Sequence, residues 1–267
     1  MFRTSFNSGF LMDCSATEAV RMIRDHGYDA AELNAETLPW AKGHIGPHTP
    51  ANVRAELARL GPYSAISAHH ADFGLADEAR RMAAVDWTLK LIETAPDYGV
   101  DIVHVIPGND ADLDCLYDSL SAAVALAGKL GIQLALEPII NQRIGTTGGM
   151  LAAIRKIPGL KVNFDPSHLE VMEHDIQDAA ERLGPHVCHV HMKDATGNPE
   201  RFAFVPLGTG TIAFEPMLRT LQAKGFDGYL SVEHESHYFA GDTRPATQVL
   251  KESREFIDAV VKRAGAR

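Results

Sequence analysis

The chain has 267 residues, of which 45% are hydrophobic and 22% are charged, a composition typical of an ordinary globular protein with a sizeable core. Its 25 Lys and Arg residues against 35 Asp and Glu residues give a net charge of −10. The chain therefore lacks the basic excess of a protein that follows a phosphate backbone, and we expect no nucleic-acid partner.

The sequence carries no signal that points to a membrane or to export. No run approaches the roughly 18 uninterrupted apolar residues that span a bilayer, and the start of the chain is polar where a signal peptide needs an apolar stretch. Cys14, Cys115 and Cys188 are far apart and form no CxxC pair, which favours reduced thiols used in packing. We expect a cytoplasmic protein with no membrane partner.

Short apolar runs typical of strands alternate with stretches of helical periodicity along the whole chain. The eight strand candidates are residues 2–8, 28–34, 64–70, 101–107, 132–138, 160–166, 186–192 and 228–234. The eight helical stretches are residues 15–26, 50–60, 76–98, 113–130, 147–157, 175–183, 214–224 and 247–263. The first helix opens with a capping box, SATE at 15–18. Four helices are followed by a glycine that we expect to be left-handed: Gly27, Gly61, Gly131 and Gly225.

Eight strand–helix units in about 260 residues match the usual size of a (β/α)8 barrel. An open, doubly wound sheet is the second interpretation, but it usually has a glycine-rich phosphate turn after an early strand, and none is present here. The sequence shows no linker and no low-complexity segment. We therefore predict a single TIM-barrel domain over residues 1–267.

Four polar residues stand out when the later strands are read at a period of two. Glu137, Asp165, His191 and Glu233 each lie on the face opposite the apolar residues of their strand. If the apolar faces meet the helix layer, these four side chains point into the barrel at the C-terminal ends of the strands. That end is the active-site mouth in TIM-barrel enzymes.

Three carboxylates and an imidazole converging at one place would repel one another unless a positive group lay among them. A divalent cation meets that need with few assumptions. A ligand set of mostly oxygen with one nitrogen suits Mn²⁺, Mg²⁺ or Co²⁺, whereas Zn²⁺ fits less well without more histidine or cysteine.

Five segments carry a resemblance to a known superfamily: LALEP, NFDPSH, HVHMKD, PLGTGTIAF and GYLSVEHE, between about residues 134 and 235. They resemble the xylose isomerase-like barrels known as sugar phosphate isomerases and epimerases, which include ketose 3-epimerases, hydroxypyruvate isomerase, inosose isomerase and dehydratase, and endonuclease IV. The resemblance implies that Glu137, Asp165, His191 and Glu233 are the metal ligands. We expect one divalent ion, Mn²⁺ first, with Mg²⁺, Co²⁺ or Zn²⁺ as alternatives.

The resemblance also assigns residues to the substrate. His168, three residues after the strand-six aspartate, corresponds to a histidine that contacts substrate oxygen. His69 and Glu32 end earlier strands near the same mouth, and we expect His69 to point inward and Glu32 to bind a hydroxyl or orient a loop. Arg143 stands where ketose 3-epimerases have a second substrate-contacting glutamate. An arginine at this position either favours a substrate with an acidic or phosphate group or points away from the site on the loop.

Three further polar residues lie close to these strand ends. We assign His104 to the barrel interior, because it lies inside its strand. Lys193 and Asp194 follow the strand-seven histidine and are expected to order the loop or to reach the substrate.

Endonuclease IV is disfavoured, since its three-zinc site needs Asp-x-His where this chain has Phe202 and Phe204, and a histidine where it has Ile106. With one metal, the resemblance implies proton transfer beside the carbonyl of a keto-sugar through a metal-stabilised enediolate, with Glu137 and Glu233 on opposite faces of the substrate. The alternatives are a lyase that cleaves 3-keto-glycosides by β-elimination and, from another class, a non-catalytic sugar-binding barrel. Relatives are often dimers or tetramers, so the resemblance leaves a homo-oligomer open.

Overall fold

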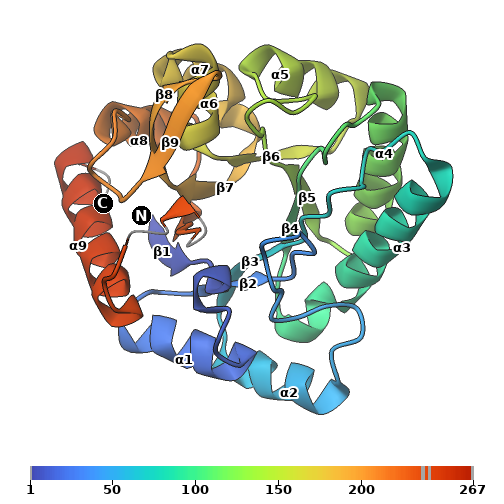
Figure 1. Ribbon diagram of the computed structural model, residues 1–267, viewed down its shortest axis with the longest axis horizontal. Helices are drawn as coiled ribbons and strands as arrows, with labels where there is room; N and C mark the ends of the chain where they lie inside the picture. Colours follow the sequence, from blue (N-terminus) through green and yellow to red (C-terminus); the bar gives the residue numbers. More distant parts are fainter. Residues whose placement is uncertain (1, 236–237, 240–241, 266–267) are drawn as a thin grey trace.

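The computed structural model describes residues 2–235, 238–239 and 242–265. Eight parallel strands form a nearly closed barrel that is surrounded by helices (Figure 1). The barrel strands are β1 (Arg3–Phe6), β2 (Ala31–Asn34), β3 (Tyr63–Ser67), β4 (Ile102–Val105), β5 (Gln133–Leu136), β6 (Lys161–Phe164), β7 (Val187–Met192) and β10 (Tyr229–Val232). The predicted (β/α)8 fold is confirmed, and each of the eight predicted strands is present.

The helices form the outer layer of the barrel (Figure 1). They are α1 (Ala16–Asp25), α2 (Ala51–Leu60), α3 (Glu78–Thr94), α4 (Leu113–Lys129), α5 (Thr147–Lys156), α6 (Pro166–Glu173), α7 (Ile176–Leu183), α8 (Phe214–Ala223) and α9 (Ala246–Ala264). Short 3₁₀ turns, η1 (Ser8–Leu11), η2 (Ala95–Tyr98) and η3 (Gly184–His186), extend three of the connections. No helix in the described ranges is long and apolar enough to cross a membrane.

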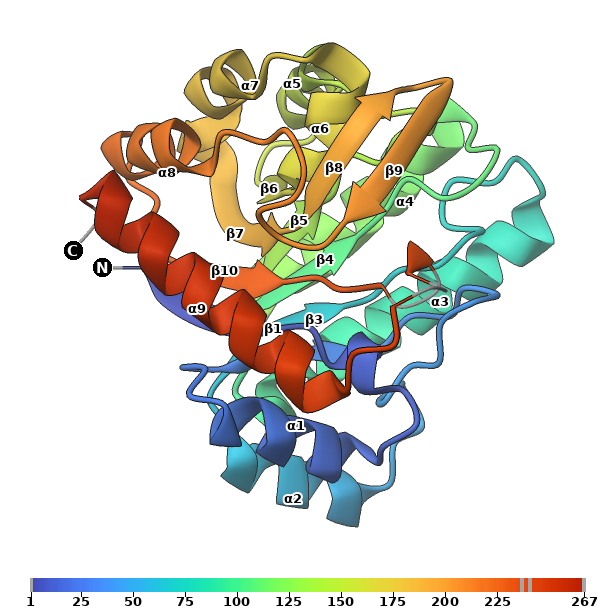
Figure 2. The same ribbon diagram turned by 60° about the vertical axis from the view of Figure 1, so that its left-hand side comes forward.

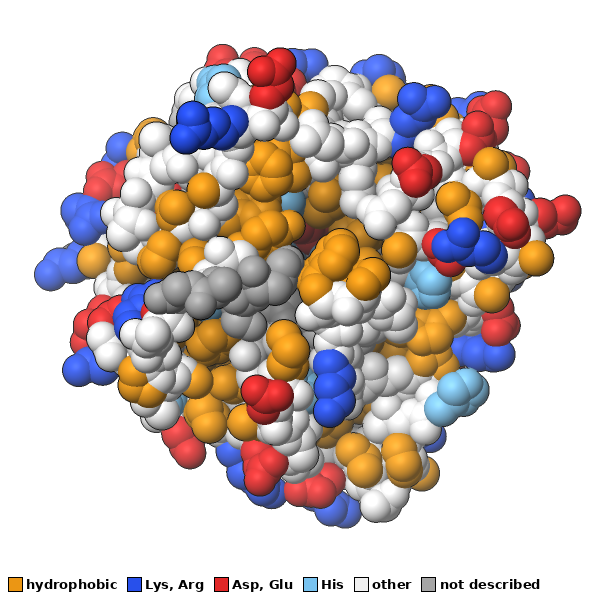
Figure 3. Space-filling model, in the orientation of Figure 1, with side chains coloured by type: hydrophobic (Ala, Val, Ile, Leu, Met, Phe, Trp, Pro, Cys, Tyr) orange, Lys and Arg blue, Asp and Glu red, His pale blue; other side chains and the backbone are white. Residues whose placement is uncertain are grey.

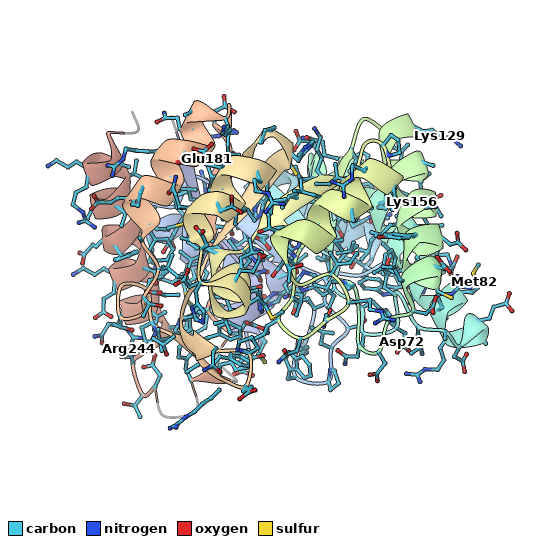
Figure 4. The ribbon with its side chains drawn as sticks, turned by 90° about the horizontal axis from the view of Figure 1, so that it is seen from above. Asp72, Met82, Lys129, Lys156, Glu181 and Arg244 are labelled. Carbon is cyan, nitrogen blue, oxygen red and sulfur yellow. The ribbon has the colours of Figure 1, made fainter. Side chains whose placement is uncertain are left out.

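The strands are hydrogen-bonded in the order β1-β10-β7-β6-β5-β4-β3-β2. The two ends of this sheet meet through a parallel bridge between Asn7 and Glu32 and through the hydrogen bond from Ala30 N to Thr4 O, 3.1 Å long. Because all eight strands run in one direction, their C-terminal ends form one rim. Figure 4 shows Asp72 and Arg244 at this end of the molecule, and Lys129, at the last turn of α4, at the other.

Local signals in the sequence explain where the helices begin and end. Ser15 and Glu18 form the predicted capping box of α1. Gly27, Gly131 and Gly225 have the expected positive φ of 83°, 72° and 97°. The prediction for Gly61 is wrong, because this residue has a φ of −51° and a ψ of 176°, so the chain leaves α2 in an extended conformation.

Two elements were not expected from the sequence. Helix α6 directly follows β6, where Asp165 caps it and Pro166 occupies its first position, both common helix-start residues. A hairpin of β8 (Asp194–Asn198) and β9 (Arg201–Val205) follows β7 and lies against α6 (Figure 2). No strand was predicted for its alternating sequence RFAFV, because this segment lies outside the alternation of strands and helices.

The interior of the barrel is polar, whereas TIM-barrel interiors are usually filled by branched apolar side chains. Ser5 Oγ lies 2.7 Å from Ser64 Oγ, and His189 Nδ1 lies 2.9 Å from Asn163 Oδ1. His104 is fully buried in the same network, as expected for a barrel-interior residue. Buried polar groups of this kind are stable when they are hydrogen-bonded to one another, so the interior side chains form a scaffold beneath the mouth.

The glycine-rich segment after β9 is held by one carboxylate. Asp194 accepts hydrogen bonds from the backbone N–H groups of Gly208, Gly210 and Ala195 at 3.0, 2.9 and 2.9 Å, and from Ile212 at 3.4 Å. A Cβ at position 210 would lie 2.1 Å from Asp194 Oδ1, so only glycine permits this approach. Of the two roles expected for Asp194, the structure places it in ordering the loop.

We expect Asp194→Ala to lower the free energy of unfolding by about 2–4 kcal/mol, because four backbone donors lose their charged acceptor. Urea denaturation measures the change. Asp118→Ala, an exposed aspartate on α4, is the control and should stay within about 0.5 kcal/mol of the parent protein. Equal stability of the two variants would show that the loop does not depend on Asp194.

Candidate metal centre

Four side chains meet at the C-terminal end of the barrel, as the strand pattern predicted. Glu137, Asp165 and Glu233 each follow directly after a strand, β5, β6 and β10, and His191 lies near the end of β7. One ligand atom from each lies within 4.8 Å of the others. His191 Nδ1 is 3.4 Å from Glu137 Oε2, 3.5 Å from Glu233 Oε1 and 3.9 Å from Asp165 Oδ2. All four residues are buried.

Two atoms of this group lack hydrogen-bond partners, and both point into its centre. Asp165 Oδ1 accepts hydrogen bonds from Ser167 N and Oγ at 2.7 and 2.6 Å. Asp165 Oδ2 and His191 Nδ1 have no hydrogen-bond partner. Burial, together with the nearby carboxylates Glu137 and Glu233, raises the pKa of Asp165 to about 7. Buried orphan ligand atoms among carboxylates fit a divalent cation of the kind that takes oxygen and nitrogen ligands.

The other ring nitrogen of His191 is held from below. His191 Nε2 lies 3.2 Å from Glu32 Oε1, a distance at which a proton on Nε2 can be donated to Glu32. In that tautomer, Nδ1 carries no proton and its electron pair faces the site. Glu32 is itself fixed by Asn7 Nδ2 at 2.7 Å and His104 Nε2 at 2.9 Å. Glu32 is fully buried. It therefore lies beneath His191, where it orients the ring, and a substrate hydroxyl would be out of its reach.

His69 points into the mouth, as predicted, and joins two carboxylates. Its Nδ1 lies 3.2 Å from Glu36 Oε1 and its Nε2 lies 3.3 Å from Glu137 Oε2. Burial opposes a positive charge on this ring, but Glu36 and Glu137 outweigh it and raise the pKa of His69 to about 10. Glu36 was missed by the sequence reasoning, although its position two residues after β2 places it at the same rim.

His168 lies on the first turn of α6 and presents one nitrogen to the mouth. Its Nδ1 accepts a hydrogen bond from Ile140 N at 3.2 Å, so in the neutral ring the proton is on Nε2. Burial lowers the pKa of His168 well below its ordinary value, which favours the neutral form. His168 can therefore donate one hydrogen bond to an oxygen atom in the mouth.

Lys193 supplies a cation beside these carboxylates. Its Nζ lies 2.8 Å from Glu233 Oε2, contacts Glu235 as well, and lies 4.1 Å from the ring centroid of Phe204. Lys193 is buried at the wall of the cavity, within reach of a bound molecule. The sequence left its role open between loop and substrate, because the partner glutamates are about 40 positions away.

A cavity opens above the four-residue group. Figure 3 shows a hollow at the centre of this face, with acidic surface inside it and hydrophobic side chains around it. The described residues that line it are Leu38, Trp40, His69, Ile106, Glu137, Ile139, Gln142, His168, Lys193, Glu233, Glu235 and Tyr238. Arg143 is exposed and lies outside this set, whereas its neighbour Gln142 belongs to it.

We expect a divalent cation such as Mg²⁺ to raise the melting temperature by about 5 °C when present at about 100 times its dissociation constant. The rise should be larger at pH 8 than at pH 5. The pKa of Asp165 is raised in the folded protein, so the carboxyl group keeps its proton below about pH 7 and must lose it to bind a cation. Thermal unfolding with and without EDTA, at the same Mg²⁺ concentration, measures the effect, and an equal rise at both pH values would contradict it.

Known proteins share this fold and sequence pattern. A protein of Escherichia coli K12 named "Putative L-ribulose-5-phosphate 3-epimerase" is 23% identical over 97% of this chain and 96% of its own. The crystal structure of the IOLI protein with a zinc atom superposes with a TM-score of 0.82 at 18% identity, covering 100% of both chains. A protein from Mycobacterium smegmatis in complex with magnesium superposes with a TM-score of 0.76 at 20% identity, covering 100% of this chain and 98% of its own. Residues 20–260 match the model of one family, and the chain belongs to it: the xylose isomerase-like TIM barrels.

Proposed function

We propose that this protein is a divalent-metal-dependent isomerase or epimerase that moves a proton beside the carbonyl group of a keto-sugar. The observation that carries the proposal is the convergence of Glu137, Asp165, His191 and Glu233 beneath a cavity, with two ligand atoms left without partners. The family contains sugar epimerases and isomerases, which supports an enzyme of that class.

The same four residues would hold the metal ion. Three carboxylates and one imidazole are a ligand set that suits Mn²⁺ first and also Mg²⁺ or Co²⁺. Zn²⁺ is the further alternative, since solved neighbours of this fold hold zinc or magnesium. When bound, such an ion supplies positive charge that stabilises negative charge developing on the substrate carbonyl oxygen.

Glu137 and Glu233 are the proposed proton carriers. They follow β5 and β10, which are separated in the sheet by β6 and β7, so they enter the cavity from different sides of the rim. One carboxylate would take the proton from carbon and the other would return it. Burial opposes the charge on Glu137, but His191 and His69 hold the pKa of this carboxyl group well below its usual range, so it is ionised and able to accept a proton.

The remaining mouth residues would position the sugar. His168 Nε2 would donate a hydrogen bond to a substrate oxygen, and the proton on His69 Nε2 would hold Glu137 in place. Gln142 lies at the same wall, where its amide accepts from Gly108 N at 3.1 Å and donates to Asn109 Oδ1 at 3.3 Å. Such positioning groups fix which carbon faces the two glutamates.

An NMR time course in D₂O with added Mg²⁺ tests the proposal directly. The panel consists of ketohexoses, ketopentoses, hydroxypyruvate, inososes and 3-keto-glycosides. We expect deuterium on the carbon beside the carbonyl group and a new sugar isomer, with no fragment released. Release of an aglycone from a 3-keto-glycoside would instead assign a lyase, and metal binding without any reaction would favour a binding protein.

Glu137→Gln and Glu233→Gln should each lower the exchange rate by about 10²–10⁴-fold, because each removes a proton carrier. Glu181→Gln is the matched control, since Glu181 lies exposed on α7, far from the mouth (Figure 4). Its rate should equal that of the parent protein. Full turnover by either of the first two variants, if folded, would refute the roles assigned to these glutamates.

Glu32→Gln should weaken metal binding by about 10–100-fold while the fold is kept, because the charge that orients His191 is lost. Isothermal titration with Mg²⁺ or Mn²⁺ gives the dissociation constant independently of activity. Glu181→Gln again serves as the control. An unchanged dissociation constant would show that Glu32 does not act through His191.

A further inference from the structure

We infer that the substrate of this site is an uncharged sugar, one that carries no phosphate or carboxylate group. The inference rests on the proposed function and narrows the proposed substrate from keto-sugars in general to those without a charged group. The name of the Escherichia coli relative contains a phosphorylated sugar, so the inferred substrate differs from that one. Four features of the mouth carry it: its lysine, the place of Arg143, the loop around Asp194 and its apolar wall.

The first feature is the state of Lys193, the one Lys or Arg among the described residues that line the cavity. A phosphate group in a protein is usually held by arginine or lysine, or by free backbone N–H groups. Lys193 Nζ already contacts the carboxylates of Glu233 and Glu235. An anionic substrate would have to displace a carboxylate from this ammonium group or lie beside both of them, and either arrangement is unfavourable.

The second feature is the position of Arg143. This residue is exposed on the loop after β5 and lies outside the described lining, so it supplies no positive charge to the cavity. The histidines of the lining do not replace it. His69 is enclosed by Glu36 and Glu137, and His168 has one nitrogen bound to the backbone of Ile140.

The third feature is the glycine-rich loop after the seventh barrel strand. In TIM barrels, the loops after strands seven and eight frequently bind a phosphate group through their backbone N–H groups. Here the N–H groups of Gly208 and Gly210 donate to Asp194 Oδ2 at 3.0 and 2.9 Å. The chain's own carboxylate therefore occupies the anion position of this loop.

The fourth feature is the apolar part of the wall. Leu38, Ile106 and Ile139 line the cavity together with the aromatic side chains of Trp40 and Tyr238. Trp40 and Tyr238 are 42% and 44% exposed, so both rings present surface at the opening. Apolar and aromatic surfaces of this kind pack against the C–H faces of a sugar and offer nothing to a phosphate dianion.

Matched pairs of sugars test the inference: L-ribulose and L-ribulose 5-phosphate, and D-fructose and D-fructose 6-phosphate. With the Mg²⁺-loaded protein, we expect deuterium exchange into the free sugar with a kcat/KM at least about tenfold above that for its phosphate ester. Equal or higher kcat/KM for either ester would overturn the inference.

Binding separates this inference from the proposed function. Ligand-observed NMR with ribitol and ribitol 5-phosphate reports the charge preference of the site without any reaction. If no sugar of the panel exchanges deuterium, that result counts against the proposed function alone, and the binding comparison still tests the charge preference. Saturable binding of ribitol 5-phosphate as tight as that of ribitol, or tighter, would overturn the preference for an uncharged substrate. Weaker binding of ribitol 5-phosphate, or none, supports it.

Glu235→Gln provides the second test, because it removes the charge of one carboxylate that contacts Lys193. We expect the ratio of ester binding to free-polyol binding to rise by about tenfold in this variant. Glu181→Gln, which removes one negative charge from the outer surface, should leave the ratio unchanged. An unchanged ratio in Glu235→Gln would show that the pairing of Lys193 does not set the charge preference.

Discussion

Buried negative charge at the C-terminal end of the barrel is the constraint on which the rest of the site depends. The carboxylates of Glu137, Asp165 and Glu233 and the ring of His191 share a space in which their ligand atoms are within 4.8 Å of one another. Carboxylates placed so closely in a buried site are costly unless cations or donors compensate them. The surrounding residues are arranged to supply that compensation, and they leave a centre whose ligand atoms fit a divalent cation.

The compensation comes from below and from the side. Beneath the site, Asn163 Nδ2 donates to Glu137 Oε2 at 2.8 Å. Glu32 adds no positive charge, but its contact with Nε2 of His191 leaves Nδ1 facing the centre. At the side, Lys193 is held between Glu233 and Glu235. A polar barrel interior is therefore part of the functional design, because an apolar interior could neither orient the imidazole nor hold the carboxylate. The same pairing leaves no spare cation in the described lining for an anionic substrate.

Local pattern explains how far prediction from the sequence could go. The eight strands and the helices between them were found because their apolar residues repeat at 2 and at 3.6 positions. Helix α6 and the β8–β9 hairpin were missed because they are insertions into that rhythm. In the site, the alternation placed Glu137 and Asp165 at the rim. Glu32 was assigned to the mouth because it ends an earlier strand, and that position does not show how deep its side chain lies.

The sequence by itself determined the order of strands and helices and the common rim of the four site residues, since both depend on periodicity and on the parallel direction of the strands. Tertiary structure decided the partners. Glu32 meets His191 across 159 positions, Lys193 meets Glu233 across 40, and Asp194 meets Gly208 across 14. These contacts depend on how the barrel closes and on how its loops fold back over the rim, which no local pattern specifies.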